Sequence, residues 1–258
     1  MRYHGLDAFP EAIRRAIEGD PYDRGDCDIS VTQLIDAPQI KALQEQGEGL
    51  STDARRAIAP LIGQSVHAYL ERFAPDGQRS EQRLFAVQGT TRISGQMDLQ
   101  EEVGGGVLIS DYKVISARSL RYDKPGYVRQ LNSYAWLCRA NGKRVLALQV
   151  IAILKDWSER EARKDASYPQ SPVVVIPIEL WSPKKVSAYI RRRVALHDAT
   201  PVPECLPEER WTGRNGPVRC LDNWCGCATI CPQFQKERAK SDDSSQFSSL
   251  PAKAGAIF

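Results

Sequence analysis

The chain has 258 residues, of which 42% are hydrophobic and 26% are charged, and its formal net charge is +3. This is the composition of a globular protein, and so small a net charge excludes a strong overall attraction to nucleic acid, which would need a local basic surface. No apolar run approaches the roughly 20 residues of a membrane span, and the charged opening of the chain predicts no secretory signal. We therefore expect a cytoplasmic protein that does not contact a membrane.

The first part of the chain, residues 1–50, is predicted to form an N-terminal helical segment. A short helical pattern covers Glu11–Ile17. Ser30 and Gln33 match a capping box before an apolar helical turn. Pro38 suits the first turn of a further short helix, Pro38–Gln46.

A longer helix is predicted from Ser51 or Thr52, either of which suits its N-cap, to about Phe73. Its apolar residues keep near-helical spacing. His67 lies on this helix, on a different face from most of the apolar residues. The helix opens the predicted core of the protein, residues 51–200.

The rest of this core alternates between strands and helices. We expect strands at residues 83–87, 91–101, 107–114, 145–155 and 173–180, helices at residues 125–140 and 182–197, and a charged loop at residues 156–171. Gly104–Gly106 is a strong turn signal, so the second and third strands are predicted to pair as an antiparallel hairpin. The order of elements predicts an α/β fold with a central mixed sheet flanked by helices.

The chain ends in two segments of different composition. Residues 201–235 combine prolines, tryptophans and cysteines, and they are predicted to form a cysteine-rich metal-binding cap. Residues 236–258 are polar and rich in serine, which predicts a disordered tail.

The predicted hairpin carries the residues on which the functional hypothesis depends. Asp111 and Lys113 alternate along one strand, so their side chains point to the same face. Asp98 lies on the neighbouring strand. Two adjacent carboxylates raise each other's pKa unless a cation lies between them, and oxygen ligands of this kind suit Mg²⁺ or Mn²⁺. Lys113 can orient or deprotonate an attacking water and neutralise developing phosphate charge.

These motifs resemble those of the PD-(D/E)xK nuclease superfamily, in the pattern Gly95-x-x-Asp98 followed by Asp111-x-Lys113. The resemblance implies a restriction-endonuclease-like core and extends over roughly residues 30–231, with motifs that are weak singly and fairly specific in this order. It implies that metal-activated water hydrolyses a phosphodiester bond of DNA.

Two further motifs are similar to the RecB-like exonuclease branch of that superfamily. Gln130-x-x-x-Tyr134 is similar to the helix that follows the catalytic hairpin, and the two side chains share one helix face. His67 stands upstream of the hairpin, where that branch has a histidine. By this resemblance Gln130 and Tyr134 would position the DNA strand or the catalytic lysine.

The resemblance also implies a role for each residue of the hairpin. Asp98 and Asp111 would ligate the metal together with the Tyr112 carbonyl, and His67 would ligate the same metal or a second one. Lys113 would handle the nucleophilic water. Glu81, at the start of a predicted strand, is interpreted as an exposed residue outside the catalytic set.

The chain has seven cysteines, four of them within residues 220–231. In a reducing compartment, clustered thiols favour a metal site over disulfides. Thiolates spaced this closely can enclose one soft metal centre. Cys138 is interpreted as a buried free thiol.

The end of the cap, Trp224-Cys225-x5-Cys231-Pro232, resembles the iron–sulfur segment of some RecB-like nucleases, including the CRISPR-adaptation nucleases and AddB. Those proteins have a cysteine before a proline where this chain has Ala37, so Cys205 is the predicted substitute and Cys27 a less favoured one. The resemblance implies a structural [4Fe–4S] cluster held by Cys205, Cys220, Cys225 and Cys231, with Cys227 as a spare. Zn²⁺ and a set of free thiols are the alternatives.

Basic and aromatic residues gather between the hairpin and the following helix, which suits contacts with a DNA strand. They are Arg118, Arg121, Tyr122, Lys124, Tyr127 and Arg129. We expect an exonuclease that acts on single-stranded or double-stranded DNA ends in recombination, repair or phage-type processing, with a helicase or recombination partner. The alternatives are an endonuclease, a non-catalytic nucleic-acid-binding protein with a degenerate nuclease fold, and a metal-cluster module that docks a larger machine.

Overall fold

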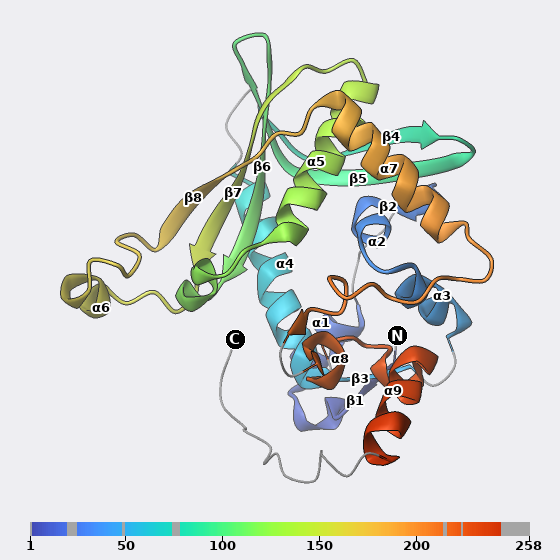
Figure 1. Ribbon diagram of the computed structural model, residues 1–258. Helices are drawn as coiled ribbons and strands as arrows, with labels where there is room; N and C mark the ends of the chain where they lie inside the picture. Colours follow the sequence, from blue (N-terminus) through green and yellow to red (C-terminus); the bar gives the residue numbers. More distant parts are fainter. Residues whose placement is uncertain are drawn as a thin grey trace. The chain divides into compact units, whose positions relative to one another are not determined.

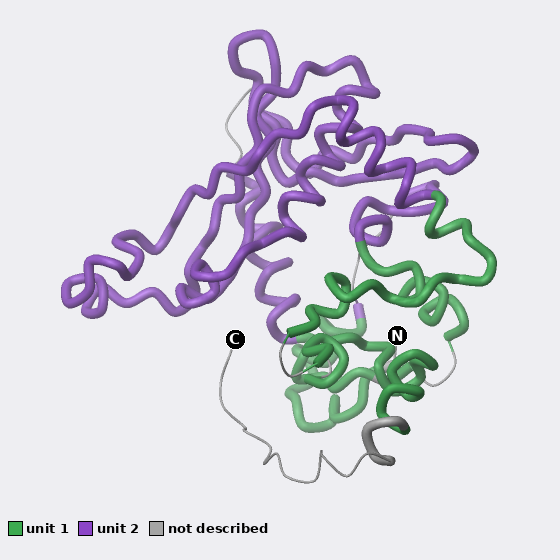
Figure 2. Tube along the Cα trace, viewed as in Figure 1, with its two compact units in different colours: residues 1–18, 36–57, 195–258 green, residues 19–35, 58–194 purple. Residues whose placement is uncertain are grey.

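A computed structural model of the chain describes residues 2–19, 25–47, 50–73, 78–213, 216–222 and 224–243. The chain divides into two compact units, shown in Figure 2. Unit 1 comprises residues 1–18, 36–57 and 195–258, and unit 2 comprises residues 19–35 and 58–194. Among the described residues, none of the helices combines the length and the apolar character needed to cross a bilayer.

A six-stranded mixed sheet forms the centre of unit 2 (Figure 1). Its strands are β2 (Ile29–Ser30), β4 (Gln78–Gln88), β5 (Thr91–Val103), β6 (Gly106–Ile115), β7 (Val145–Leu154) and β8 (Val173–Ile178). Strand β5 pairs antiparallel with β4 and β6 and parallel with β2. Strand β7 pairs parallel with β6 and antiparallel with β8. The predicted α/β fold with a central mixed sheet is confirmed.

The turn between β5 and β6 is the glycine turn that the sequence predicts. Gly104 and Gly105 have φ angles of 54° and 76°, in the left-handed region that suits glycine. The two strands pair as the predicted antiparallel hairpin, from Val103↔Gly106 to Leu99↔Ser110.

Unit 2 also contains several helices. They are α2 (Val31–Ile35), α4 (Ile58–Glu71), the 3-10 turn η3 (Ala117–Arg121), α5 (Pro125–Ala140), α6 (Glu159–Lys164) and α7 (Pro183–His197), whose last residues belong to unit 1. Helix α5 lies along the sheet in Figure 1 and buries Leu131, Ala135 and Leu137 completely. These side chains share one apolar core with Met97 of β5 and Val150 of β7.

Gly95 lets α5 approach β5 closely. A Cβ atom at this position would lie 2.6 Å from Cδ1 of Leu137 and 2.9 Å from Cε1 of Tyr134. Both distances are well inside van der Waals contact, so any side chain here would push the helix away from the sheet. The glycine of the Gly95-x-x-Asp98 motif therefore has a packing role.

Sequence signals for the starts of α2 and α3 are confirmed. Ser30 and Gln33 form the predicted capping box: the Ser30 amide donates to Gln33 Oε1 at 3.2 Å, and the Gln33 amide donates to Ser30 Oγ at 3.3 Å. Helix α3 has the predicted bounds, Pro38–Gln46. The predicted loop at residues 156–171 differs, because Ser158 caps the short helix α6 by accepting from the Glu161 amide.

The predicted start of the His67 helix is wrong. Residues Ser51–Asp53 form strand β3, which pairs parallel with β1 (Arg2–His4). A 3-10 turn, η2 (Ala54–Ala57), follows, and α4 begins at Ile58. Pairing with a distant strand overrides the local capping signal at Ser51 and Thr52.

Unit 1 is built from short elements. Besides β1, β3, η2 and α3, they are η1 (Leu6–Ala8), α1 (Glu11–Glu18), β9 (Thr212–Gly213), β10 (Gly216–Pro217), α8 (Val218–Leu221), η4 (Ala228–Ile230) and α9 (Pro232–Asp243). Its core combines apolar residues of α3 with the cysteine-rich segment and Phe234. Helix α9 includes Lys236–Asp243, the first residues of the predicted disordered tail, and residues 244–258 lie outside the described residues.

Candidate active site

The two strands of the hairpin stop pairing beside Asp98 and Asp111. The last pair of the β5–β6 ladder is Leu99↔Ser110, and the next residue on each strand is Asp98 or Asp111. Beyond this point the Tyr112 amide donates a 2.7 Å hydrogen bond to Oδ2 of Asp98. A carboxylate thus takes the place of a backbone acceptor, which fixes Asp98 where the strands separate.

Asp111 is buried in the sheet, with 2% of its surface exposed. Oδ2 lies 2.5 Å from Nζ of Lys113, as the predicted same-face placement requires, whereas Oδ1 is buried and accepts no hydrogen bond from the described residues. Burial raises the pKa of Asp111 to about 6, against the Lys113 charge, which lowers it. Burial alone would lower the pKa of Lys113, but the Asp111 carboxylate outweighs it and the pKa is raised.

His67 reaches this point from α4. Its Nδ1 lies 3.5 Å from Oδ1 of Asp98, and its Nε2 lies 3.0 Å from the carbonyl oxygen of Tyr112. The hydrogen bond with Asp98 raises the pKa of His67, although burial opposes this. The structure therefore brings His67, Asp98, Asp111 and Lys113 together around the Tyr112 backbone.

Glu81 belongs to the same cluster, although the sequence interpretation left it out. One ligand atom each from His67, Glu81 and Asp98 lies within 4.8 Å of the other two. The neighbouring pairs Ser80↔Leu99 and Gln82↔Met97 place Glu81 opposite Asp98 across the β4–β5 ladder. Like charges in directly opposed positions destabilise a sheet unless a cation separates them.

The backbone and the neighbours of Glu81 fit this location. Its φ angle is 50°, which is uncommon for a residue other than glycine, and Nε2 of Gln96 donates a 2.5 Å hydrogen bond to Oε2. Burial raises the pKa of the Glu81 carboxyl. The predicted strand began at Arg83, whereas β4 begins at Gln78, so Glu81 lies inside the strand. Counting the antiparallel register back from the turn at Gly89 would have placed Glu81 opposite Asp98, and this is the sequence signal that could have identified Glu81.

Helix α5 places the Tyr127 ring beside Lys113 and also carries the pair Gln130 and Tyr134. Nε2 of Gln130 donates a 2.9 Å hydrogen bond to the hydroxyl of Tyr134, so the two motif residues act as one unit. Tyr127, in the first turn, has its ring centroid 5.7 Å from Nζ of Lys113. This is the range of a cation–π interaction, which helps to hold the ammonium group in place.

The donor set of this cluster fits a hard divalent cation. Carboxylate oxygens, a backbone carbonyl and one imidazole nitrogen are ligands that Mg²⁺ and Mn²⁺ accept. The buried Oδ1 of Asp111 is the strongest sign, because a charged oxygen so placed costs free energy unless something binds it.

The predicted cysteine ligands gather in unit 1. Cys205, Cys220, Cys225 and Cys231 are free thiols and pack in one cluster with Cys227 and Ala37. The sulfurs of Cys205 and Cys231 lie 3.3 Å and 3.7 Å from the same oxygen, Oε1 of Gln39. Burial, and then the nearby Cys231, raise the pKa of Cys205 to about 12.

The two other cysteines belong to unit 2. Cys138 is fully buried, as predicted, with its sulfur 3.5 Å from that of Met97. Cys27 accepts a 3.2 Å hydrogen bond from the hydroxyl of Ser94. Cys205, the favoured substitute for the missing ligand, lies with the other cap thiols in unit 1.

Residues 43–232 match the sequence profile of the PD-(D/E)XK nuclease superfamily. The match covers well over half of the chain, and the chain therefore belongs to this superfamily. Its members are nucleic-acid hydrolases that use divalent metal ions, in agreement with the fold and with the cluster of His67, Glu81 and Asp98.

Solved structures resemble the chain in fold. The crystal structure of SSO0001 has a TM-score of 0.57 and 16% sequence identity, over 86% of this chain and 94% of that one. A structure from Eubacterium rectale, described as a candidate exonuclease, has a TM-score of 0.33 and 14% identity over 51% of each chain, too little to support an argument. No curated protein sequence matches the chain.

Proposed function

We propose that this chain is a Mg²⁺- or Mn²⁺-dependent deoxyribonuclease of the RecB-like branch, acting as an exonuclease on DNA ends. The observation that carries the proposal is the convergence of His67, Asp98, Asp111 and Lys113 where the hairpin strands separate. A degenerate, non-catalytic relative would be expected to lack a charged member of this set, and all four are present.

Asp98, Asp111, the Tyr112 carbonyl and His67 are the groups that would hold the cation. When bound, the cation would polarise the scissile phosphate and lower the pKa of a ligated water. Lys113, held by Asp111, orients the attacking water and offsets negative charge that develops on the phosphate.

The residues of α5 complete the proposed site. Gln130, hydrogen-bonded to Tyr134, contacts the DNA strand and keeps it in line with the hydrolytic water. Tyr127 shields one side of the Lys113 ammonium group from solvent. Both tasks are positional, so their loss should reduce the rate less than loss of an acidic residue.

The test is digestion of labelled linear single-stranded, linear double-stranded and circular DNA, with Mg²⁺, Mn²⁺ or a chelator. We expect metal-dependent release of nucleotides from linear DNA and none from circular DNA. Asp111→Ala and Lys113→Ala should abolish it, whereas Glu159→Ala, an exposed acidic residue of α6, should not. Cleavage of circles would indicate an endonuclease, and binding without cleavage in either metal would refute the nuclease proposal.

We further propose that Cys205, Cys220, Cys225 and Cys231 hold a [4Fe–4S] cluster with a structural role in a reducing, cytoplasmic setting. Soft thiolates are the ligands of such clusters and of Zn²⁺. Anaerobic purification with measurement of iron, sulfide and zinc decides between them: stoichiometric zinc without iron would refute the cluster. A helicase or recombination protein is the proposed partner, because it would deliver DNA ends to the nuclease.

A further inference from the structure

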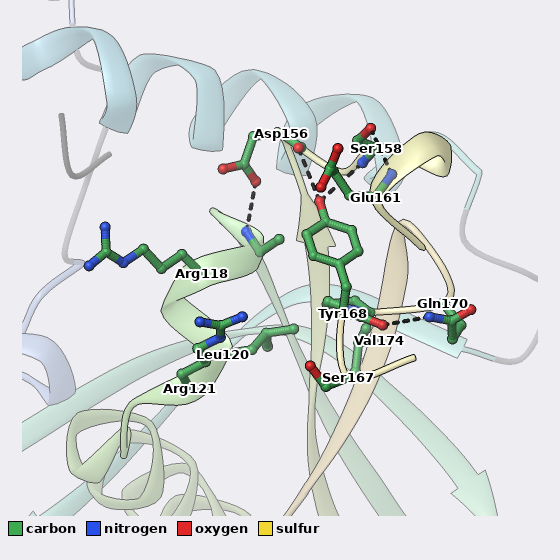
Figure 3. A pocket seen from close by; sticks show the side chains of 12 residues that line it. Arg118, Leu120, Arg121, Asp156, Ser158, Glu161, Ser167, Tyr168, Gln170 and Val174 are labelled. Carbon is green, nitrogen blue, oxygen red and sulfur yellow. Dashed lines mark hydrogen bonds between the residues drawn. The ribbon is translucent and has the colours of Figure 1, made fainter. Parts of the chain in front are cut away.

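A pocket of about 670 Å³ opens in unit 2 just beyond the catalytic strand (Figure 3). One side comes from η3, which follows β6, and the other comes from the segment between β7 and β8. Ala117 is four residues past Lys113. At roughly 3.3 Å per residue, the pocket begins within about 13 Å of the proposed catalytic lysine.

One hydrogen bond joins the two sides of the pocket, and two others order the segment between β7 and β8. The Ala117 amide donates to Oδ1 of Asp156 at 2.7 Å. The Tyr168 hydroxyl accepts from the Ser158 amide at 3.1 Å and donates to the Asp156 carbonyl at 3.3 Å. Such a framework presents a pre-formed site, which lowers the cost of ordering a ligand.

The η3 side of the pocket is cationic. Arg118 and Arg121 both line it and are exposed, and in Figure 3 they lie across the pocket from Gln170. Among the described residues no salt bridge joins either guanidinium to a carboxylate, but Arg121 lies near Asp165: hydrogen bonds from Ser167 and, more weakly, the Arg121 charge lower the pKa of that carboxyl. Two exposed guanidinium groups on one short turn can contact a phosphate.

The rest of the lining suits a planar, partly polar group. Leu120, Pro169 and Val174 give apolar contacts, and the Tyr168 ring stands in the pocket in Figure 3. The volume of the pocket falls within the range of about 300–1,000 Å³ that is usual for small-molecule sites. An aromatic and apolar lining beside arginines is the combination that binds a nucleobase and its phosphate.

Acidic groups restrict what else the pocket can accept. Glu161 lines the side away from η3, whereas the Asp156 carboxylate is held against η3 by the Ala117 amide. Carboxylates repel a second phosphate but accept hydrogen bonds from the amino groups of a base. The pocket therefore fits one nucleotide with its phosphate toward η3, rather than a polyanion along its whole length.

We propose that this pocket binds one nucleotide of the substrate strand, a few positions from the scissile phosphate. Arg118 and Arg121 contact the phosphate, and the base lies against Tyr168 and Leu120. The inference rests on the proposed nuclease function and gives it a strand-anchoring subsite. The same nucleotide chemistry occurs in a free mononucleotide product, and the test separates the two.

The test measures binding of a fluorescent single-stranded 12-nucleotide DNA in chelator, where cleavage is not expected. The double variant Arg118→Ala/Arg121→Ala should weaken binding about 10- to 100-fold, at about 1.4 kcal/mol per tenfold. It should also reduce the salt dependence of log K by about 0.7, because the two arginines share one phosphate and each phosphate contact to a single strand contributes about 0.7. Arg160→Ala, an exposed α6 arginine outside the pocket lining, is the control and should bind like wild type.

A second arm adds a deoxynucleoside 5′-monophosphate as competitor. Failure of millimolar mononucleotide to compete, with loss of binding in the double variant, supports a strand subsite. Full displacement of the oligonucleotide by the mononucleotide would instead assign the pocket to the product and overturn the strand proposal. Equal affinity and equal salt dependence in wild type and double variant would refute the pocket altogether. Because binding is measured without metal, absence of nuclease activity in the wild type would refute the proposed function separately.

Discussion

The Asp98 carboxylate accepts a 2.7 Å hydrogen bond from the backbone amide of Tyr112. This contact joins the two hairpin strands where their ladder ends, and it leaves the other carboxylate oxygen 3.5 Å from Nδ1 of His67. Asp98 therefore has two tasks: it accepts a structural hydrogen bond, and it contributes a negative charge to the site.

Replacement of Asp98 should separate these two tasks. Asp98→Asn keeps an acceptor for the Tyr112 amide and loses the charge, so it should melt close to wild type while nuclease activity falls at least about 1,000-fold. Asp98→Ala should lose activity equally and also about 1–3 kcal/mol of unfolding free energy, because a buried amide is left without a partner. Thermal melting and digestion assays on both variants give the comparison. Near-wild-type activity in Asp98→Asn would contradict the proposed metal site.

Glu81 should affect the metal requirement of the reaction. Because its carboxylate is grouped with His67 and Asp98, Glu81→Gln should raise the Mn²⁺ concentration for half-maximal activity about tenfold. The control is Glu159→Gln, an exposed residue of α6 that pairs with Arg163 and lies outside that group. Metal titration of initial rates provides the measurement, and identical titration curves for wild type and Glu81→Gln would show that Glu81 takes no part.

Gly95 should tolerate no side chain. Gly95→Ala places a methyl group 2.6 Å from Leu137, and the strain should cost about 1–3 kcal/mol of unfolding free energy. Gly63→Ala in α4 meets nothing within 4 Å, so it should stabilise the protein by up to about 1 kcal/mol through helix propensity. Urea unfolding of the two variants should therefore give changes of opposite sign.

Asn132 should be among the most sensitive polar residues of unit 2. It is fully buried, and its side chain donates to the Glu179 carbonyl at 2.9 Å and accepts from the Trp181 amide at 2.7 Å. Asn132→Ala leaves both backbone groups without this hydrogen-bond partner and should lower the free energy of unfolding by about 3 kcal/mol. Ser133→Ala, whose hydroxyl bonds only within α5, should cost less than about 1 kcal/mol. Comparable losses of unfolding free energy in the two variants would argue against this link between α5 and the segment that follows β8.

The cap cysteines should differ in their effect on metal content. Cys205→Ser should lose most of the bound iron or zinc and lower the melting temperature, because a hydroxyl is a poor soft-metal ligand. Cys227→Ser should retain the metal, since Cys227 is the residue left outside the predicted set. Elemental analysis of both purified variants measures this, and the reverse pattern would exchange the roles of the two residues.

Local sequence signals predicted the elements that carry the candidate site residues. Helix α5 has the predicted bounds, Pro125–Ala140, because proline and the closing Asn141-Gly142 mark its ends within a few residues. The glycine turn likewise brings Asp98 and Asp111 to neighbouring strands. Periodicity and turn chemistry act over short distances, so one chain segment is enough to reveal them.

Other features depend on contacts between segments far apart in the chain. Glu81 lies at the site because β4 begins as early as Gln78 and pairs with β5 on both sides of Glu81, which itself has a positive φ. The helix at Ile58 starts late because Ser51–Asp53 pairs with the N-terminal strand. The sequence by itself therefore determined that Asp98, Asp111 and Lys113 come together on the hairpin and where the main helices lie, whereas tertiary packing decided the place of Glu81, the start of α4 and the pocket beside η3. The physical reason is that strand register and long-range packing depend on which partner segment is buried alongside, and local propensity does not encode that partner.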